Sequence, residues 1–459
     1  MKVCIIGAGP AGIISAISIC NTLKNKKLDI DIYDPGTPFR GRSLNTYSKS
    51  MLMNTSIGVT FINPDEPDGL MTFIKEREKR DVNAGEFVTR DSFSCFLEHE
   101  FKKVNPHTGH INFINEEVSC IYPDKMNNPC IMHNNKESAY DAVVIATGLP
   151  FRALPDFFPA DKVILPYPSQ GLTKIKRDAL VLIIGSHLSA VDTLVHLAES
   201  DHSGRINIYS HEHLLPSVRN HVMKEKKQKF LEDYLQNTKN MPNDFSKIDY
   251  LTESFKNYLT INNMNILETL PIDQGTETEK QLSIDIKNCQ DKTNAWESIL
   301  MDIIDALNDT WPSLHTPDKI RFQKEVFPWI GRIIASMPLR NGKIIEELFH
   351  KKQIHFLNNS EFSAINLSEY DVIVNATGHL PAENDKLLSQ LSANKMIRFN
   401  GCGGISINKL THRVNDDIPI YATGMIVQGE VFTANSIYST SYGSQKIANN
   451  IRDTLNKAT

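Results

Sequence analysis

The N-terminal stretch KVCIIGAGPAGIISAISIC restricts the fold of this chain more than any other feature. Its apolar run at residues 3–6 has the β-branched composition of a buried parallel strand. The GxGxxG spacing follows at once, in Gly7, Ala8, Gly9, Pro10, Ala11 and Gly12. Gly7 permits a sharp turn, Gly9 keeps side chains away from a phosphate, and Gly12 lets the next helix pack closely on the strand. The pattern predicts the first half of a βαβ unit.

The residues after this helix complete the unit. LDIDIYDP, at residues 28–35, alternates apolar and polar side chains as a strand does, and it ends at Asp34. Asp34 lies 22 residues after Gly12, where a carboxylate would receive the ribose hydroxyls of an adenosine. The sequence therefore predicts a dinucleotide site, with its pyrophosphate facing the N-terminus of the helix.

Three further apolar runs end in Ala-Thr-Gly. They are YDAVVIATG at residues 140–148, YDVIVNATGH at 370–379 and IPIYATG at 418–424. Small residues at the end of a buried strand let a ligand come close to the backbone. Thr147, Gly148 and Gly424 are therefore candidate cofactor contacts.

A second strand, turn and helix are predicted near the middle of the chain. VLIIGSHLSAVD, at residues 181–192, begins with a buried strand, and RINIYS at 205–210 supplies the next one. Ala190 is small enough for the packing role of the third glycine. We therefore expect a second βαβ unit here.

The ligand of this second unit depends on a histidine. His187 stands where the first unit has its second glycine, and its imidazole could clash with a pyrophosphate or donate a hydrogen bond to a phosphate. Ser210 and His211, which end the following strand, offer neither an acid for NAD nor an arginine for NADP. Gly185, His187 and Ser189 are the candidate contacts of NADPH or NADH, and a vestigial domain is the alternative.

With these motifs the chain resembles flavoproteins that have two dinucleotide-binding domains. The group includes glutathione-reductase-like enzymes, N-hydroxylating monooxygenases and Baeyer–Villiger monooxygenases. The resemblance implies an α/β fold, in which an FAD-binding Rossmann-like domain contains an inserted second Rossmann-like NAD(P) domain and a helical insert. The implied segments are 1–160 for the first part of the FAD domain, 175–215 for the NAD(P)-binding-like βαβ unit, 216–350 for the insert, and 351–459 for the C-terminal part of the FAD domain.

Two further stretches resemble one bacterial branch of FAD/NAD(P)-binding proteins. They are MLMNTSIGVTFINPDEPDGLMTFI at residues 51–74 and FVTRDSFSCFLEHEF at 87–101. The resemblance places Asn54 and Arg90 close to FAD. The alternatives are a turn residue for Asn54 and an exposed charge at a helix N-terminus for Arg90.

The C-terminal stretch has small and apolar residues at helical spacing from Ser436 to Ile447. In the family this helix points its N-terminus at the flavin ring, where it would stabilise the negative charge of reduced flavin. Thr433 and Asn435, with Ser436, are candidate caps or ring contacts. The alternative is a packing helix with an ordinary polar cap.

Residues 216–350 are rich in Lys, Asn, Glu and Leu and have few glycines. KEKKQKFLEDYLQNTKN at 224–240 and AWESILMDIIDALND at 295–309 predict amphipathic helices. We expect the basic residues at 224–229 to form a solvated helix face and Trp329 to pack in a core. This helical block is the candidate substrate region.

Composition excludes several other classes. A net charge of −5 does not favour nucleic acid or an anionic membrane as the main partner, and outside the N-terminal nucleotide-binding turn no apolar run reaches the roughly 20 residues of a membrane span. Seven dispersed cysteines without a CxxC pair favour reduced thiols in the cytoplasm and exclude a zinc knuckle or paired redox thiols. The histidines His211, His213, His379 and His412 show no metal-ligand spacing, although His379 directly follows an Ala-Thr-Gly turn.

These observations favour an FAD-dependent oxidoreductase reduced by NAD(P)H, acting as a monooxygenase on a small-molecule substrate. The first alternative is a flavin oxidase or dehydrogenase that takes hydride directly from its substrate and keeps a vestigial NAD(P) domain. The second is a non-catalytic protein that binds FAD as a scaffold. No acid–base or nucleophilic constellation stands out in the sequence.

Overall fold

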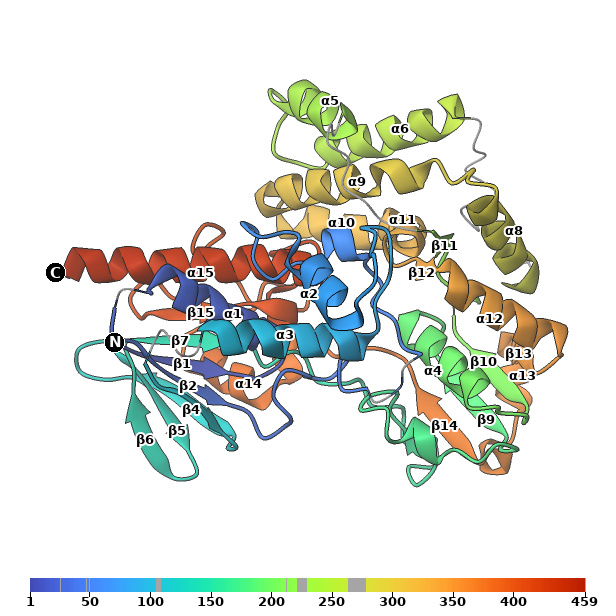
Figure 1. The fold of residues 1–459 in the computed structure, drawn as a ribbon, viewed down its shortest axis with the longest axis horizontal. Helices are drawn as coiled ribbons and strands as arrows, with labels where there is room; N and C mark the ends of the chain where they lie inside the picture. Colours follow the sequence, from blue (N-terminus) through green and yellow to red (C-terminus); the bar gives the residue numbers. More distant parts are fainter. Residues whose placement is uncertain are drawn as a thin grey trace.

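The computed structural model describes residues 1–24, 26–46, 48, 50–104, 109–211, 213–220, 229–262 and 278–458. These residues form two parallel five-stranded sheets, which lie side by side, and a helical unit above them (Figure 1). This is the expected α/β fold with two Rossmann-like units. Within the described ranges, no helix is both long and apolar enough to cross a membrane.

The first sheet has the strand order β15-β7-β1-β2-β3, and all its neighbours are parallel. Its strands are β1 (Lys2–Ile6), β2 (Asp29–Tyr33), β3 (Ile111–Ile114), β7 (Ala142–Ile145) and β15 (Ile420–Ala422). Val3 and Ile5 belong to the core on one face, whereas Cys4 and Ile6 belong to the core on the other. Burial of both faces explains why this strand is continuously apolar.

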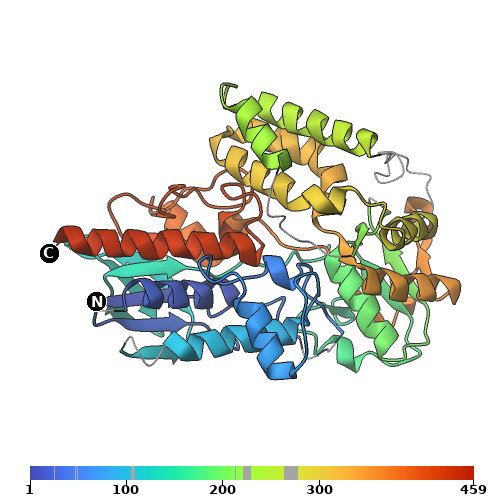
Figure 2. The ribbon, with the colours of Figure 1, turned by 45° about the horizontal axis from the view of Figure 1, so that its top comes forward.

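Helices cover one face of the first sheet. They are α1 (Pro10–Thr22), α3 (Arg90–Val104) and α15 (Ile437–Ala458), with α2 (Gly69–Glu78) packed on α3. Figure 2 shows α15 lying along α1, so the C-terminal residues cover the N-terminal helix. The other face carries an antiparallel sheet and α14 (Lys386–Ala393). The strands of that sheet are β4 (Val118–Pro123), β5 (Pro129–His133) and β6 (Lys136–Ala139).

The second sheet has the order β13-β10-β9-β14-β8 and is also parallel. Its strands are β8 (Val163–Ile164), β9 (Val181–Ile184), β10 (Ile206–Tyr209), β13 (Ile354–Phe356) and β14 (Val372–Asn375). One face packs against α4 (Leu188–Glu199), α8 (Thr278–Gln290) and α12 (Leu339–His350). The other face packs against residues around α13 (Asn359–Ala364).

The assignment of residues 351–459 to the first domain is wrong for two strands. β13 and β14 pair with β10 and β9, so they belong to the second sheet. YDVIVNATGH therefore closes the second unit, and IPIYATG closes the first beside β7. The turns have the same sequence because each follows a buried strand of a parallel sheet, and this local environment is common to both units.

The helical unit has its own core around Trp296, Phe255 and Phe322. Its helices are α5 (Lys229–Thr238), α6 (Ser246–Ile261), α9 (Trp296–Thr310), α10 (Thr316–Glu325) and α11 (Phe327–Ile334). Two short paired strands, β11 (Val218–Arg219) and β12 (Met337–Pro338), connect this unit to the second sheet. The amphipathic helix predicted at 295–309 is confirmed as α9. Residues 224–228 of the amphipathic helix predicted at 224–240 lie outside the described residues, and residues 229–238 of it form α5. Trp329 packs in this core, with its ring stacked 6.1 Å from that of Phe255.

Short 3-10 helices complete the description: η1 (Ile57–Val59), η3 (Leu172–Lys174), η4 (Trp311–Ser313), η5 (Leu367–Glu369), η6 (Ala382–Asn384) and η7 (Gly424–Val427).

Candidate functional site

The first glycine turn joins β1 to α1. A Cβ atom on Gly7, whose φ is 110°, would lie 2.4 Å from the carbonyl oxygen of Ala146. A Cβ atom on Gly12 would lie 1.8 Å from the carbonyl oxygen of Gly7. Neither position has room for a side chain, so β1, β7 and α1 meet through backbone alone. Gly9 caps α1 and approaches Gly41, so the first N–H groups of the helix point toward the space above the turn.

Asp34 follows β2 and stabilises this turn. Its Oδ2 accepts a hydrogen bond from the backbone N–H of Ala8 at 2.6 Å, and its Oδ1 accepts one from Gly36 at 2.6 Å. The carboxylate therefore stands at the carboxyl end of β2 and next to the glycine turn. This is where the sequence predicts a ribose contact.

The Ala-Thr-Gly turns after β7 and β15 lie beside the same helix end. A Cβ atom on Gly148 would have no other atom within 4 Å, so this turn has an open side. Gly424 lies against α1, because its Cβ position is 2.9 Å from the Cβ atom of Ala11. Thr147 is half-buried, and Pro10 is the first residue of α1. The structure thus brings these predicted residues to the carboxyl ends of β1, β7 and β15.

Arg42 also belongs to this group, although the spacing of the motifs does not predict it. Its Nη1 donates a hydrogen bond to the carbonyl oxygen of Leu149, and its guanidinium lies 5.1 Å from the centroid of the Phe151 ring. Burial lowers the pKa of Arg42, while Asp385 and Asp34 oppose this effect. A cation beside a glycine turn is suited to a phosphate. The signal in the sequence was the RGR stretch after Asp34.

The second turn repeats the geometry of the first. The backbone N–H of Gly185 donates to the carbonyl oxygen of Tyr209 at 2.8 Å, as that of Gly7 donates to Tyr33 at 2.8 Å. A Cβ atom on Gly185 would lie 2.5 Å from the carbonyl oxygen of Ala376. Gly378 belongs to the Ala-Thr-Gly turn that follows β14. A Cβ atom on it would have no other atom within 4 Å, so this turn has an open side like that at Gly148.

His187 takes the position of Gly9 at the N-cap of α4. Its backbone is extended, with φ −82° and ψ −164°, and its side chain is exposed. The imidazole therefore does not pack into the turn. Ser189 lies in the first turn of α4 and interacts with the hydroxyl of Tyr167.

Two segments that leave the Ala-Thr-Gly turns cross between the sheets. The backbone N–H of Arg152 donates to Gly378 at 3.1 Å, and that of Leu380 donates to Pro150 at 2.8 Å. The rings of Phe151 and His379 stack 5.0 Å apart at this crossing. Burial lowers the pKa of His379, and the charge of Arg42 lowers it further. A neutral imidazole therefore stands between the two turns.

Arg90 lies at the edge of the first unit that faces the second. Arg90 is buried and pairs with Asp192 of α4, so it is not the exposed helix charge considered above. Asn54 is half-buried in the loop that follows Leu52, which bridges to Thr89.

The loop before α15 is ordered by its own hydroxyl groups. Ser436 caps the helix, because its Oγ accepts a hydrogen bond from the backbone N–H of Ser439 at 3.0 Å. Thr433 is buried, and its Oγ1 lies 2.6 Å from Oγ of Ser439. Asn435 is exposed beside the cap. The capping role predicted for Ser436 is present.

The helical unit contacts this loop directly. Nε1 of Trp311 donates to the carbonyl oxygen of Gly429 at 3.0 Å, and Nζ of Lys319 lies 3.4 Å from a carboxylate oxygen of Glu430. Nδ2 of Asn308 donates to Thr433 at 3.4 Å. The insert therefore fixes the backbone from which α15 begins.

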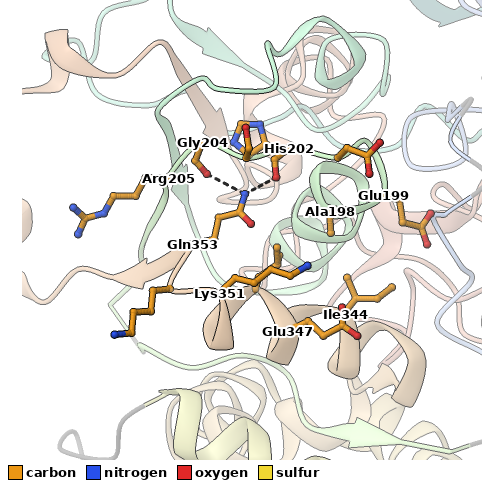
Figure 3. A pocket seen from close by; sticks show the side chains of 13 residues that line it. Ala198, Glu199, His202, Gly204, Arg205, Ile344, Glu347, Lys351 and Gln353 are labelled. Carbon is orange, nitrogen blue, oxygen red and sulfur yellow. Dashed lines mark hydrogen bonds between the residues drawn. The ribbon is translucent and has the colours of Figure 1, made fainter.

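A cavity of about 690 Å³ lies elsewhere, at the amino ends of β10 and β13 (Figure 3). Nε2 of Gln353 donates there to the carbonyl oxygens of His202 and Gly204 at 2.6 and 3.0 Å. Because the glycine turns occupy the carboxyl ends of the strands, this cavity is not part of either turn. Among the described residues no cluster of three or more His, Cys, Asp or Glu could hold a metal ion.

Part of the chain matches a known protein family. Residues 4–150 match the model of the FAD-NAD(P)-binding family, and they therefore form an FAD-NAD(P)-binding domain. No curated protein matches the chain.

Solved structures with the same fold span nearly the whole chain. An ornithine hydroxylase from Pseudomonas aeruginosa is 14% identical, with 99% of each chain covered and a TM-score of 0.58. An L-lysine 6-monooxygenase from Pseudomonas syringae is 12% identical, with 99% of each chain covered and a TM-score of 0.59. OTEMO in complex with FAD and NADP is 13% identical over 100% of this chain and 86% of that one, with a TM-score of 0.54. The fold is therefore that of flavoproteins with two dinucleotide-binding domains.

Proposed function

We propose that the protein is an FAD-dependent oxidoreductase whose flavin is reduced by NAD(P)H, and that it acts as a monooxygenase on a small molecule in the cytoplasm. The observation that carries this proposal is the repetition of one turn geometry in both sheets, with an open side beside each. One dinucleotide turn would suit a protein that only binds FAD. Two equivalent turns, joined at a crossing, suit transfer between two dinucleotides.

The residues of the first turn fit FAD. Gly7, Gly9, Pro10, Ala11 and Gly12 form a backbone cradle in which N–H groups at the end of α1 would bind the pyrophosphate. Asp34 would receive the ribose, and Arg42 would balance phosphate charge. Thr147, Gly148 and Gly424, with Asn54 further away, would line the remaining space. Arg90 is buried and would support the site through the loop at Ser43. Thr433 and Asn435 lie at the N-terminus of α15, which would stabilise negative charge on the ring.

The second turn fits NADPH or NADH. Gly185 provides the close backbone, Ser189 lies in the first turn of α4, and Gly378 leaves the space beside them open. His187 is exposed at the helix cap, where its ring would donate a hydrogen bond to a phosphate.

FAD, when bound, would supply hydride acceptance and reactivity with oxygen. The protein's own contribution is to orient the two dinucleotides and to exclude water. The stacked rings of Phe151 and His379 close the crossing between the units, and the insert covers the loop before α15. Solved structures of the same fold include an ornithine hydroxylase and an L-lysine 6-monooxygenase, which supports oxygenation. A bacillithiol disulfide reductase shares the fold as well, so it is the lack of a CxxC pair in the sequence that argues against disulfide reduction.

A visible spectrum and an anaerobic titration test the proposal. We expect the purified protein to bind FAD, to turn yellow, and to lose its absorbance when NADPH or NADH is added without oxygen. Readmitted oxygen should restore the spectrum, and a substrate should accelerate oxygen uptake. Candidate small amines and ketones can be screened by that uptake.

Other outcomes would favour the alternatives. A yellow protein that neither nicotinamide bleaches would contradict the proposal and favour a flavin oxidase or dehydrogenase with a vestigial second domain. A yellow protein that no electron donor or substrate reduces would favour a scaffold. A protein that cannot take up FAD would overturn the assignment entirely.

A further inference from the structure

A buried ion pair connects the two dinucleotide-binding units. Arg90 begins α3 of the first unit, and Asp192 lies in the first half of α4 of the second. Nη2 of Arg90 and Oδ2 of Asp192 are 2.5 Å apart, and the two side chains are 7% and 2% exposed. Such a pair resists displacement, because separating its members leaves an uncompensated charge out of water.

On one side, the Arg90 guanidinium holds the loop that covers the first glycine turn. Nη1 donates to the carbonyl oxygen of Ser43 at 2.8 Å, and Nε donates to that of Leu52 at 3.2 Å. Ser43 comes two residues after Gly41, whose backbone approaches Gly9. The three donors of one rigid guanidinium thus join Asp192 to the backbone of the first site.

On the other side, Asp192 is joined to the second glycine turn through Tyr167. The Tyr167 hydroxyl donates a hydrogen bond to Oδ2 of Asp192 and also interacts with Ser189. The Tyr167 ring is buried, and the Arg90 guanidinium lies 5.2 Å from its centroid. A continuous set of contacts therefore runs from the first turn of α4 to the loop at the first site.

Neighbouring contacts keep this interface closed. Met51 comes from the first unit but is fully buried in the core of the second. Nη1 of Arg340, at the start of α12, donates to the carbonyl oxygen of Ser50 at 3.1 Å. The loop of the first unit is therefore inserted between α4 and α12, with the ion pair at its base.

We infer that Arg90 and Asp192 are positioning residues that fix α4, and with it the nicotinamide dinucleotide, relative to the flavin site. This role rests on the proposed function: the ion pair would keep the FAD site and the nicotinamide dinucleotide site aligned. Arg90 acts in it through Ser43 and Asp192 and need not touch FAD. Because hydride transfer requires close alignment, a displacement of about 1 Å is enough to slow it by about 100-fold.

Stopped-flow reduction of FAD-loaded protein by saturating NADPH or NADH tests the inference. Asp192→Asn keeps the shape and the bond from Tyr167 but removes the charge. We expect it to retain the flavin spectrum and the FAD dissociation constant, and to lower the limiting rate of reduction by 10-fold or more. The matched control is Glu199→Gln, which removes an exposed ion pair with Arg340 that joins α4 to α12 within the second unit, beside the interface, and should leave the rate unchanged.

Arg90→Lys provides the second variant. It keeps the positive charge but loses the guanidinium donors that bind the carbonyl oxygens of Ser43 and Leu52. If Asp192→Asn does not fold, the same fall in limiting rate in Arg90→Lys supports the inference. Wild-type rates in the variants that fold would overturn it. An equal fall in Glu199→Gln would also overturn it, since any change at the interface would then suffice.

A readout independent of nicotinamide separates this inference from the proposed function. Hydrogen exchange of the amides in the first turn of α4 is measured with and without FAD. In the wild type, FAD should slow this exchange, because the contacts run from the first site to Ser189. The effect should disappear in Asp192→Asn. If the wild type is not bleached, the proposed function fails, and equal protection in both proteins would overturn the inference as well.

Discussion

At the scale of the residue, the affinity of the second turn for NADPH or NADH depends on His187. It replaces the glycine that the first unit has at the same cap, yet its side chain is exposed and outside the turn. We expect His187→Ala to raise the dissociation constant of NADPH or NADH about 10-fold, because one hydrogen bond to a phosphate is lost. The limiting rate of flavin reduction should change little. Both values come from the dependence of the stopped-flow rate on nicotinamide concentration.

The flavin content of the variant is the control, because His187 does not belong to the first unit. Tighter binding in His187→Ala would contradict the expectation and show that the imidazole obstructs the site.

A second residue makes the stability of the protein depend on pH. Burial lowers the pKa of His412 to about 4 from 6.5, against the hydrogen bond that its Nδ1 donates to Ala422 at 3.0 Å. The unfolded chain therefore takes up this proton at higher pH than the folded chain. The free energy of unfolding should fall by about 3 kcal/mol as pH drops from 6.5 toward 4, and it should be fully retained above 6.5.

Urea denaturation at several pH values measures this contribution. His412→Asn is a suitable variant, because asparagine tolerates the positive φ of 59° at this position. Its unfolding free energy should depend less steeply on pH between 4 and 6.5. An unchanged slope would show that other groups account for the acid sensitivity.

At the scale of the element, the two strand–turn–helix units differ in how tightly they are closed. A Cβ atom on Gly12 would overlap the backbone of Gly7, whereas Ala190 carries one at the equivalent position of α4. Gly12→Ala should therefore lower the free energy of unfolding by about 3 kcal/mol and prevent FAD binding. The matched change Ala190→Gly should cost about 1–2 kcal/mol, through helix propensity and the loss of one buried methyl group. Denaturation curves and flavin content give both values, and equal effects would contradict the argument.

The sequence predicts the elements of both units because their signals are local. An apolar run, a glycine turn and a helix lie within about 20 residues of one another, and each signal follows from backbone geometry. The sequence does not assign YDVIVNATGH to its sheet, because three similar strands are divided between two sheets and nothing local says which strand belongs to which. The choice is made by pairing with β9, which is a contact between distant residues.

The residues of the candidate site also differ in how far the sequence predicts them. Glycines and Asp34 can be found from their spacing, because the turn requires them. Arg42 is signalled no more strongly than by the RGR stretch at residues 40–42, and Asp192 cannot be found in this way, since a charged residue within a helix has no distinctive spacing. Their importance arises from what they meet, Leu149 in one case and Arg90 in the other.

At the scale of the whole molecule, the helical insert is joined to the loop that would face the flavin. Trp311 donates to Gly429 from a buried position, so Trp311→Phe leaves that carbonyl without its partner. We expect a loss of about 1–3 kcal/mol in stability and a shift in the visible spectrum of bound FAD. Trp329→Phe, in the core of the same insert, should change stability without shifting the spectrum. A shift in both variants would contradict a local effect on the loop.

The arrangement of the whole chain places two equivalent turns at one crossing, with the Arg90–Asp192 pair fixing their distance and the insert covering one side. In the proposed function each turn holds a dinucleotide, and hydride passes from one dinucleotide to the other. The most direct test is anaerobic stopped-flow reduction of the FAD-loaded protein over a range of NADPH and NADH concentrations. We expect bleaching whose rate saturates with one of these nucleotides, because a complex forms at the second turn before the hydride is transferred. Absence of bleaching, or a rate that rises linearly without saturation, would contradict it.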